Sequence, residues 1–315
     1  MPRAPDNPHF WWDEDLADEA LAQWVAETRA HPSPGPPFDL VALRRPRQRR
    51  AGPSVRTLDD VEVPGDPPVP ARLYRPADEP LPLVVYVHGG GFVAGDLDSH
   101  DRTCRRLAVE ARTSVLAVDY RLAPEHPAPA AINDVVSVGR WASTRPNVLG
   151  ALVGGPGLAG DSSGAAIALL AARSLVFGAT PASALLLVCP NADLTLAEPS
   201  VREKGTGWGL SAVALEWFVH QWVPTLDEPS LRRFSPLHAD LTGLLPTIVA
   251  TAEHDPLHDE GAALVDRLVS FGVEAHHVPH PGLVHGFLGL DDVSPAAREA
   301  GTALMRRFGE LLPRR

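Results

Sequence analysis

Cysteine is almost absent from this chain, which has only Cys104 and Cys189 among its 315 residues. Two cysteines cannot build the framework of a small disulfide-rich secreted protein, and two unpaired thiols are typical of a reducing compartment. Long apolar runs are missing too, since none approaches the about 20 residues that a membrane-spanning helix needs. The N-terminal residues lack the apolar core of a secretory signal and soon turn acidic. These absences predict a soluble, cytoplasmic protein.

Positive charge is also scarce. The 28 lysines and arginines are outnumbered by 39 aspartates and glutamates, which leaves a formal net charge of −11. That balance argues against nucleic acid and anionic membranes as partners. A basic cluster between Arg44 and Arg50 is interpreted as a solvated linker face, because the chain as a whole is acidic. The expected partner is a small molecule, and any self-association is expected to give a homodimer.

From residue 56 onward, short apolar runs alternate with segments that have helical periodicity. Two segments near 56–76 have the alternation and turn flanks of an antiparallel strand pair. Buried strands are predicted over 83–88, 114–120, 184–190, 246–255 and from 274, with helices over 99–112, 129–144, 163–177, 256–271 and 295–312. This alternation predicts an α/β fold with a mostly parallel central sheet and helices on both faces.

Two helical, tryptophan-rich segments interrupt the alternation, one over 10–30 and one over 211–223. We expect them to come together as a cap over the edge of the sheet where ligands bind in open α/β folds. The large rings of the two segments are candidates for substrate binding, namely Trp11, Trp12, Trp208 and Trp217. The predicted organisation is 1–50 as the first part of the cap, 51–195 as core, 196–230 as the second part of the cap and 231–315 as core.

The sequence Gly160-Asp161-Ser162-Ser163-Gly164 opens the predicted helix that begins at 163. A G-x-S-x-G between a strand and a helix is typical of a turn that exposes a nucleophilic serine. The turn is tight enough to strain the serine backbone, and a Cβ at either glycine would collide with a neighbouring element. The strand before it is rich in glycine and contains Pro156, so we expect only 157–160 to form strand.

A serine hydroxyl is a weak nucleophile that needs a base, and the base needs an acid to orient it. Where a G-x-S-x-G serine is used this way, the chain order is serine, acid, histidine. Asp255 ends the predicted strand 246–255, and His285 lies in PGLVHGF after the last predicted strand. Order and position therefore assign Ser162, Asp255 and His285 as candidate catalytic residues.

The run His88-Gly89-Gly90-Gly91-Phe92 directly follows a predicted strand. Consecutive glycines leave their N–H groups unshielded and permit backbone conformations that aim them at one point. Gly90 and Gly91, together with the N–H of Ser163, are candidate donors to an oxyanion. His88 is interpreted as a residue that holds this loop, and Asp161 as one that satisfies loop amides.

These motifs resemble those of the hormone-sensitive-lipase-like esterases, the bacterial family IV carboxylesterases of the α/β-hydrolase superfamily. The matching stretches are 88–108, 119–135, 159–169, 235–261 and 281–287. The resemblance implies an α/β-hydrolase fold with a helical cap, and a serine carboxylesterase that acts on short-to-medium acyl esters through an acyl-enzyme on Ser162. It implies neither a cofactor nor a metal. Ser163 departs from the alanine usual in the family, which should not disturb a backbone donor.

Other interpretations stay open. A deacetylase, amidase or thioesterase dedicated to one metabolite would use the same residues, as would an eliminating enzyme. A small-molecule receptor on the same fold is a different class, and the presence of both Ser162 and His285 argues against it. His254 and His258, near Asp259, suggest a metal only weakly, because no further ligand is suitably spaced.

Overall fold

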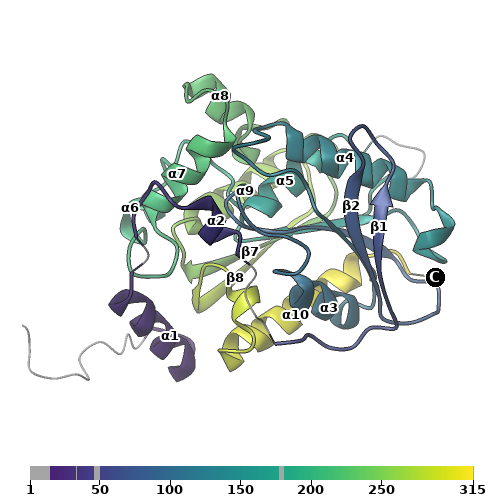
Figure 1. Cartoon of the computed structure of the whole chain (residues 1–315), viewed down its shortest axis with the longest axis horizontal. Helices are drawn as coiled ribbons and strands as arrows, with labels where there is room; N and C mark the ends of the chain where they lie inside the picture. Colours follow the sequence, from purple (N-terminus) through teal and green to yellow (C-terminus); the bar gives the residue numbers. More distant parts are fainter. Residues whose placement is uncertain (1–14, 33, 46–49, 177–180, 315) are drawn as a thin grey trace, which may run out of the picture.

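The computed structural model describes residues 15–32, 34–45, 50–176 and 181–314. Within that part of the chain, an eight-stranded sheet has the order β1-β2-β4-β3-β5-β6-β7-β8 (Figure 1). The strands are β1 Thr57–Val63, β2 Val69–Arg75, β3 Leu83–Val87, β4 Ser114–Val118, β5 Gly157–Asp161, β6 Leu185–Val188, β7 Thr247–His254 and β8 Ala275–Val284. The α/β fold with a mostly parallel sheet is confirmed.

The predicted antiparallel pair is present as β1 and β2, and β2 continues antiparallel onto β4. From β4 to β8 all neighbouring strands are parallel. Strands β3 and β4 are buried along their whole length, as their unbroken apolar sequences predict. Strand β5 is short because it starts after Pro156, again as predicted.

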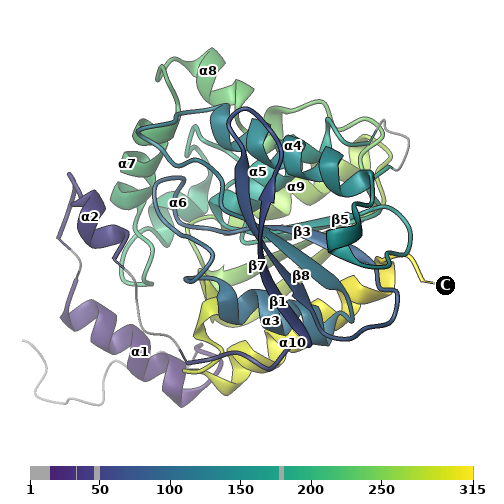
Figure 2. The same cartoon turned by 45° about the vertical axis from the view of Figure 1, so that its right-hand side comes forward.

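Helices cover both faces of the sheet (Figure 2). Helices α4, α5 and α9 lie on one face, and α3 and α10 lie on the other. Their bounds are α3 Asp101–Glu110, α4 Ala130–Ser143, α5 Ser163–Ala172, α9 His258–Ser270 and α10 Pro295–Leu311. All ten residues of α5 are buried. Its sequence of small and aliphatic residues therefore suits the centre of the molecule.

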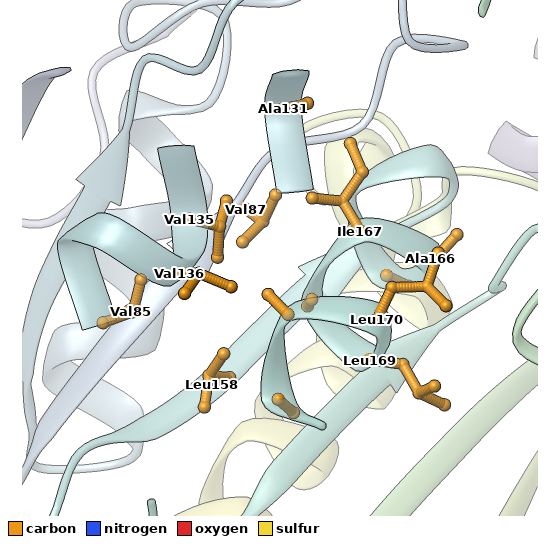
Figure 3. Packing of buried hydrophobic residues seen from close by; sticks show 14 of the residues in the cluster. Val85, Val87, Ala131, Val135, Val136, Leu158, Ala166, Ile167, Leu169 and Leu170 are labelled. Carbon is orange, nitrogen blue, oxygen red and sulfur yellow. The ribbon is translucent and has the colours of Figure 1, made fainter. Parts of the chain in front are cut away.

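The packing around α5 joins sheet and helices into one apolar layer (Figure 3). Val85 and Leu158 project from strands β3 and β5 toward the helices. Val135 of α4 and Ile167 of α5 meet them and are fully buried. This layer fixes the position of α5, whose N-terminus carries the G-x-S-x-G serine.

The remaining α-helices lie in the N-terminal 50 residues or in the stretch between β6 and β7. They are α1 Glu19–Ala30, α2 Leu40–Leu43, α6 Pro199–Glu203, α7 Ala212–Trp222 and α8 Glu228–Arg233. Helix α1 starts later than expected because Asp18 is its N-cap and accepts a hydrogen bond from the Leu21 N–H at 2.8 Å. Residues 10–14 of the predicted helix, with Trp11 and Trp12, lie outside the described residues.

The N-terminal segment and the 196–230 insert, far apart in the sequence, contact each other. The Arg29 guanidinium donates to the Gly207 carbonyl at 2.8 Å and lies 4.4 Å from the centre of the Trp208 ring. The Phe38 ring meets the Trp217 ring edge-on at 5.1 Å between centroids. Helices α1, α2, α6 and α7 therefore lie on the same side of the molecule (Figure 1).

The N-terminal segment is also attached to the core near the end of β8. The Ala17 N–H donates to the Gly282 carbonyl at 3.0 Å, and the Gly282 N–H donates to the Glu253 carboxylate at 2.8 Å. Gly282 has a φ of 66°, and a Cβ there would lie 2.6 Å from the Ala17 nitrogen. Only glycine permits this close approach of the two backbones.

The interpretation of the basic cluster as a solvated linker is wrong for Arg44, whose side chain contacts the core. Its guanidinium forms two hydrogen bonds of 2.8 Å with Glu125. It also donates to the carbonyls of Val93 at 2.7 Å and Ala123 at 2.8 Å. A planar guanidinium that reaches a carboxylate and two carbonyls holds the end of α2 against the core loops.

We predict that Trp222→Ala lowers the free energy of unfolding by about 3–5 kcal/mol. The Trp222 side chain is 1% exposed and its ring stacks on that of Phe92 at 3.9 Å, so the substitution leaves a cavity between α7 and the core. Urea denaturation followed by circular dichroism measures the change. Val213→Ala, on the exposed side of α7, should shift stability by less than about 0.5 kcal/mol. Equal effects of the two substitutions would contradict this assignment of the interface.

Candidate active site

The G-x-S-x-G turn joins β5 to α5 with Ser162 at φ 54° and ψ −124°. This conformation is rare for a residue with a side chain, and it is the strained turn that the sequence predicts. A Cβ on Gly160 would lie 2.5 Å from the Gly164 carbonyl oxygen, and one on Gly164 would collide with the carbonyl oxygen of Val87. Both glycines are thus required for the helix to start this close to the sheet.

The structure brings Ser162, His285 and Asp255 together from the ends of three strands. The Nε2 atom of His285 lies 3.0 Å from the Ser162 hydroxyl oxygen. Its Nδ1 atom lies 2.8 Å from a carboxylate oxygen of Asp255. Asp255 is fully buried, and its other oxygen accepts the Leu257 N–H at 2.8 Å. The arrangement suits proton transfer from the hydroxyl to the imidazole.

Burial disfavours the charged form of His285, but the charge of Asp255 and its hydrogen bond favour it more. The pKa of His285 is therefore raised above its ordinary value. An imidazole with a raised pKa is a stronger base for a hydroxyl proton.

Gly90 and Gly91 follow β3 with φ values of 134° and 61°, which favour glycine. A Cβ on Gly91 would lie 2.5 Å from the Phe218 ring of α7, so this loop also fits tightly beneath the insert. Within the described chain, no hydrogen bond occupies the N–H of Gly90, Gly91 or Ser163. The three predicted donors are thus available at the N-terminus of α5, which itself favours negative charge.

Asp161 and His88 hold the loop that carries these glycines. One oxygen of Asp161 accepts the Gly89 N–H at 3.1 Å and the Tyr86 hydroxyl at 2.6 Å. The His88 Nδ1 atom lies 2.9 Å from the Gly89 carbonyl, and its ring stacks on Tyr120 at 4.3 Å. Burial lowers the pKa of His88 to about 4. The sequence predicted that His88 and Asp161 hold this loop. It did not predict the contacts of Tyr86 and Tyr120, because no motif spacing relates them to the loop.

A cavity of about 310 Å³ opens onto Ser162, His285 and the glycine loop. The insert contributes apolar side chains to its wall, namely Leu210, Leu215, Phe218 and Val219. The rest of the lining includes Leu43, Arg44 and Arg45 of the N-terminal segment and core residues such as His100 and Asn191. His100 was not predicted, and its Nε2 atom lies 3.6 Å from Asp161.

The expectation that Trp208 and Trp217 line the cavity needs correction, because neither residue is part of its wall. Trp208 stacks on His254 at 4.0 Å between ring centroids. Trp217 meets Phe38 edge-on, while the next residue, Phe218, lines the cavity and also stacks on Phe38 at 6.0 Å between ring centroids. Helix α7 turns by about 100° per residue, and the side that faces the cavity carries Leu215, Phe218 and Val219 rather than Trp217. Trp11 and Trp12 lie outside the described residues.

Neither His254 nor His258 belongs to a cluster that could hold a metal within the described chain. The one such cluster found there is Cys189, Asp255 and His285, whose ligand atoms lie within 4.8 Å of one another. Its carboxylate and imidazole are hydrogen-bonded to each other, and the imidazole also contacts Ser162. His258 instead contacts Asp259 at 2.9 Å.

A family model described as alpha/beta hydrolase fold matches residues 84–289. The carboxylesterase NlhH of Mycobacterium tuberculosis is 39% identical over 249 residues, which cover 76% of this chain and 78% of the relative. The ethyl acetate hydrolase of Pseudomonas putida is 36% identical over 238 residues, 73% of this chain and 75% of that protein. A solved esterase structure from Pyrobaculum calidifontis has a TM-score of 0.77 at 37% identity, covering 82% of this chain and 86% of its own. Within the described residues, no helix is both long and apolar enough to cross a bilayer.

We predict that the imidazoles of His285 and His88 titrate on opposite sides of the ordinary histidine value. His285 should stay protonated to higher pH because of Asp255, and His88 should stay neutral down to about pH 4 because it is buried. Histidine ring resonances followed by NMR against pH measure both, with His285→Asn and His88→Asn providing the assignments. Two midpoints near the ordinary value of about 6.5 would contradict the electrostatic account.

Proposed function

The chain belongs to the α/β-hydrolase fold family, among the hormone-sensitive-lipase-like esterases, and is a carboxylic ester hydrolase; we propose that Ser162, His285 and Asp255 carry out its reaction. The observation that carries this proposal is the continuous hydrogen-bonded path from the Ser162 hydroxyl through the His285 imidazole to the Asp255 carboxylate. Its members lie in the strained turn and the two loops that the chain order predicts.

In the proposed reaction, the Ser162 oxygen attacks the ester carbonyl while His285 Nε2 takes the hydroxyl proton. Asp255 holds the imidazole so that Nε2 faces the serine, and its charge stabilises the imidazolium that forms. The carbonyl oxygen becomes negatively charged and accepts hydrogen bonds from the N–H groups of Gly90, Gly91 and Ser163.

Collapse of this intermediate breaks the bond to the alcohol oxygen, which takes the proton from His285. The acyl group stays on the Ser162 oxygen. A water molecule then attacks it, giving its proton to His285, and the carboxylic acid leaves as the serine oxygen recovers a proton. Every proton in this cycle moves through Nε2 of one imidazole.

The substrates we propose are esters of short-to-medium acyl chains, of about two to six carbons. A wall of Leu210, Leu215 and Phe218 closes the cavity on the side of the insert and limits the length of chain it accepts. The name of one relative, ethyl acetate hydrolase, specifies a small ester. A dedicated deacetylase, amidase or thioesterase would use the same geometry, so amide and thioester analogues belong in the first substrate panel.

We further propose that residues 1–50 and 196–230 act together as the cap over the core formed by 51–195 and 231–315. The contacts of Arg29 with Gly207 and of Phe38 with Trp217 support this division. A cytoplasmic location is proposed from the two free buried cysteines, Cys104 and Cys189. A homodimer is proposed on the outer edge of β8, the last strand of the sheet among the described residues.

We predict that Ser162→Ala abolishes hydrolysis of p-nitrophenyl butyrate and leaves the thermal unfolding midpoint close to that of the wild type. The substitution removes the attacking oxygen, and the side chain it shortens is partly exposed to the cavity. A fluorophosphonate probe followed by peptide mass spectrometry should label Ser162 and leave Ser163 unlabelled. Wild-type turnover by the alanine variant, or labelling of Ser163 in its place, would reject the proposal.

We predict that Phe218→Ala shifts the preferred acyl chain to greater length. Removing the ring enlarges the cavity beside Gly91, and each methylene that is newly buried contributes about 0.8 kcal/mol to transition-state binding. The measurement is kcat/KM over p-nitrophenyl esters of increasing acyl length. Glu216→Ala, on the exposed side of the same helix, should leave the profile unchanged. A wild-type preference for acyl chains of more than about ten carbons would contradict the proposal of short-chain substrates.

A further inference from the structure

Strands β7 and β8 do not keep one register along their whole length. Ala252 pairs with His280, but the next paired residues are His254 and Val284. Glu253 of β7 therefore faces three residues of β8, and β8 bulges at this point. A bulge interrupts the hydrogen-bonded ladder and bends the strand that contains it. Regular strand pairing alone therefore does not hold the end of β8.

The bulge lies directly before His285, since β8 ends at Val284. A bulge beside an active site changes the direction of the side chains that follow it. The imidazole must point its Nε2 atom at Ser162 and its Nδ1 atom at Asp255, over distances of 3.0 and 2.8 Å. Both contacts can be made at once only when the bulge keeps its shape.

Glu253 holds the bulge through its side chain. Gly282 lies within the bulge and is buried, so its N–H needs an acceptor from the protein. That N–H donates to a carboxylate oxygen of Glu253 at 2.8 Å. The Glu253 side chain thus replaces the ladder hydrogen bond that the bulge interrupts, three residues before His285.

Both partners of this contact are also held by residues outside the sheet. The Gly282 carbonyl accepts the Ala17 N–H at 3.0 Å. The Glu253 carbonyl accepts a hydrogen bond from the side-chain ammonium of Lys204, which belongs to the 196–230 insert. Since neither backbone can shift freely, the carboxylate and the N–H are preorganised for each other.

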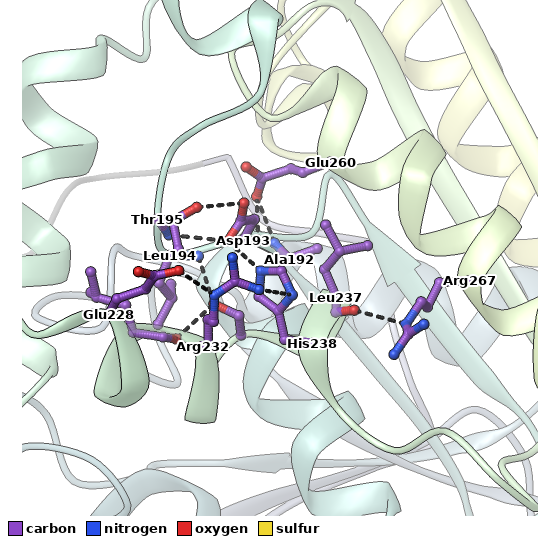
Figure 4. Close-up of polar contacts among 12 residues, drawn as sticks. Ala192, Asp193, Leu194, Thr195, Glu228, Arg232, Leu237, His238, Glu260 and Arg267 are labelled. Carbon is purple, nitrogen blue, oxygen red and sulfur yellow. Dashed lines mark hydrogen bonds and ion pairs between the residues drawn. The ribbon is translucent and has the colours of Figure 1, made fainter.

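A second glutamate makes a similar contact on the β6 side of β7. One oxygen of the fully buried Glu260 accepts the N–H groups of Ala192 and Asp193 at 2.6 and 3.2 Å (Figure 4). The loop held in this way follows β6 and carries none of the three residues proposed to react. Glu253 is therefore the glutamate whose contact lies close in the chain to a reacting group.

We propose that Glu253 is a positioning residue for His285, because its carboxylate holds the bulge of β8 from which the imidazole reaches Ser162. This inference rests on the proposed function, since it assumes that His285 exchanges the proton. Burial lowers the pKa of His285, and the carboxylates that raise it are those of Asp255 and Asp161. Glu253 therefore acts through the position of its oxygen rather than through its charge. It does not belong to the described residues that line the cavity, so it acts without touching the substrate.

The test compares three substitutions of Glu253 by kcat and KM for p-nitrophenyl butyrate. Glu253→Ala should lower kcat about tenfold and leave KM nearly unchanged, because a displaced imidazole impairs proton transfer rather than binding. Glu253→Gln keeps an oxygen at the same distance from the backbone and should retain most of kcat. Glu253→Asp keeps the charge on a shorter side chain and should behave like Glu253→Ala. Glu274→Ala, an exposed glutamate just before β8, is the matched control and should leave kcat unchanged.

NMR tests the same inference without a substrate. The proton on Nδ1 of His285 should resonate far downfield in the wild type, because it is hydrogen-bonded to Asp255. In Glu253→Ala this resonance should shift or broaden as the imidazole loses its fixed direction, whereas Glu253→Gln should retain it. Loss of the signal in His285→Asn assigns it.

The inference is overturned if Glu253→Ala keeps the wild-type kcat, or if Glu253→Gln loses as much as Glu253→Asp. A fall in kcat with an unchanged His285 resonance would overturn it too. Should Glu253→Ala fail to fold, as judged by circular dichroism, the comparison of Glu253→Gln with Glu253→Asp still decides. Butyrate hydrolysis by the wild type, set against Ser162→Ala, tests the proposed function separately. Equal cleavage of butyrate by the wild type and Glu253→Ala would keep the function and refute the inference.

Discussion

The close approach of α5 to the ends of β3 and β5 is the constraint on which the rest of the site depends. It exists because Gly160 and Gly164 have no Cβ to collide with the opposing carbonyls. The strain this leaves at Ser162 is held by the buried layer that fixes α5. Asp161 then ties the same turn to the Gly89 N–H. The serine and the glycine loop are thereby positioned by one short segment, so a displacement of either affects both.

Two histidines near this turn, His88 buried and His285 partly buried, have different roles because their surroundings differ. His285 faces a fully buried carboxylate, and its imidazolium is favoured. His88 has aromatic neighbours and a carbonyl, and its neutral form is favoured because burial dominates. One residue is equipped to exchange a proton, whereas the other keeps a constant charge while it supports a loop. Sequence position distinguishes them only because His88 precedes glycines and His285 follows the last strand.

The central sheet could be predicted because strands β3 and β4 are buried on both faces and read as unbroken apolar runs. The nucleophile turn and the order of Ser162, Asp255 and His285 could be predicted because they depend on local geometry and on the ends of neighbouring strands. The wall of the cavity could not be predicted, since the face of α7 that lines it depends on how the helix docks on residues far away in the sequence, among them Phe38 and Gly91. The role of Arg44 could not be predicted for a related reason. Its contacts with Val93, Ala123 and Glu125 form only on folding, and no spacing in the chain encodes them.

The backbone hydrogen bond between Ala17 and Gly282 joins the N-terminal segment to the chain three residues before His285. Docking of that segment and placement of the imidazole therefore belong to one thermodynamic cycle. A ligand that binds more tightly when the segment is docked must strengthen docking by the same factor. Ligand binding then stabilises the docked state of the segment by the same free energy that docking adds to ligand binding. A probe on the N-terminal segment would therefore report occupancy of the cavity without contacting the ligand.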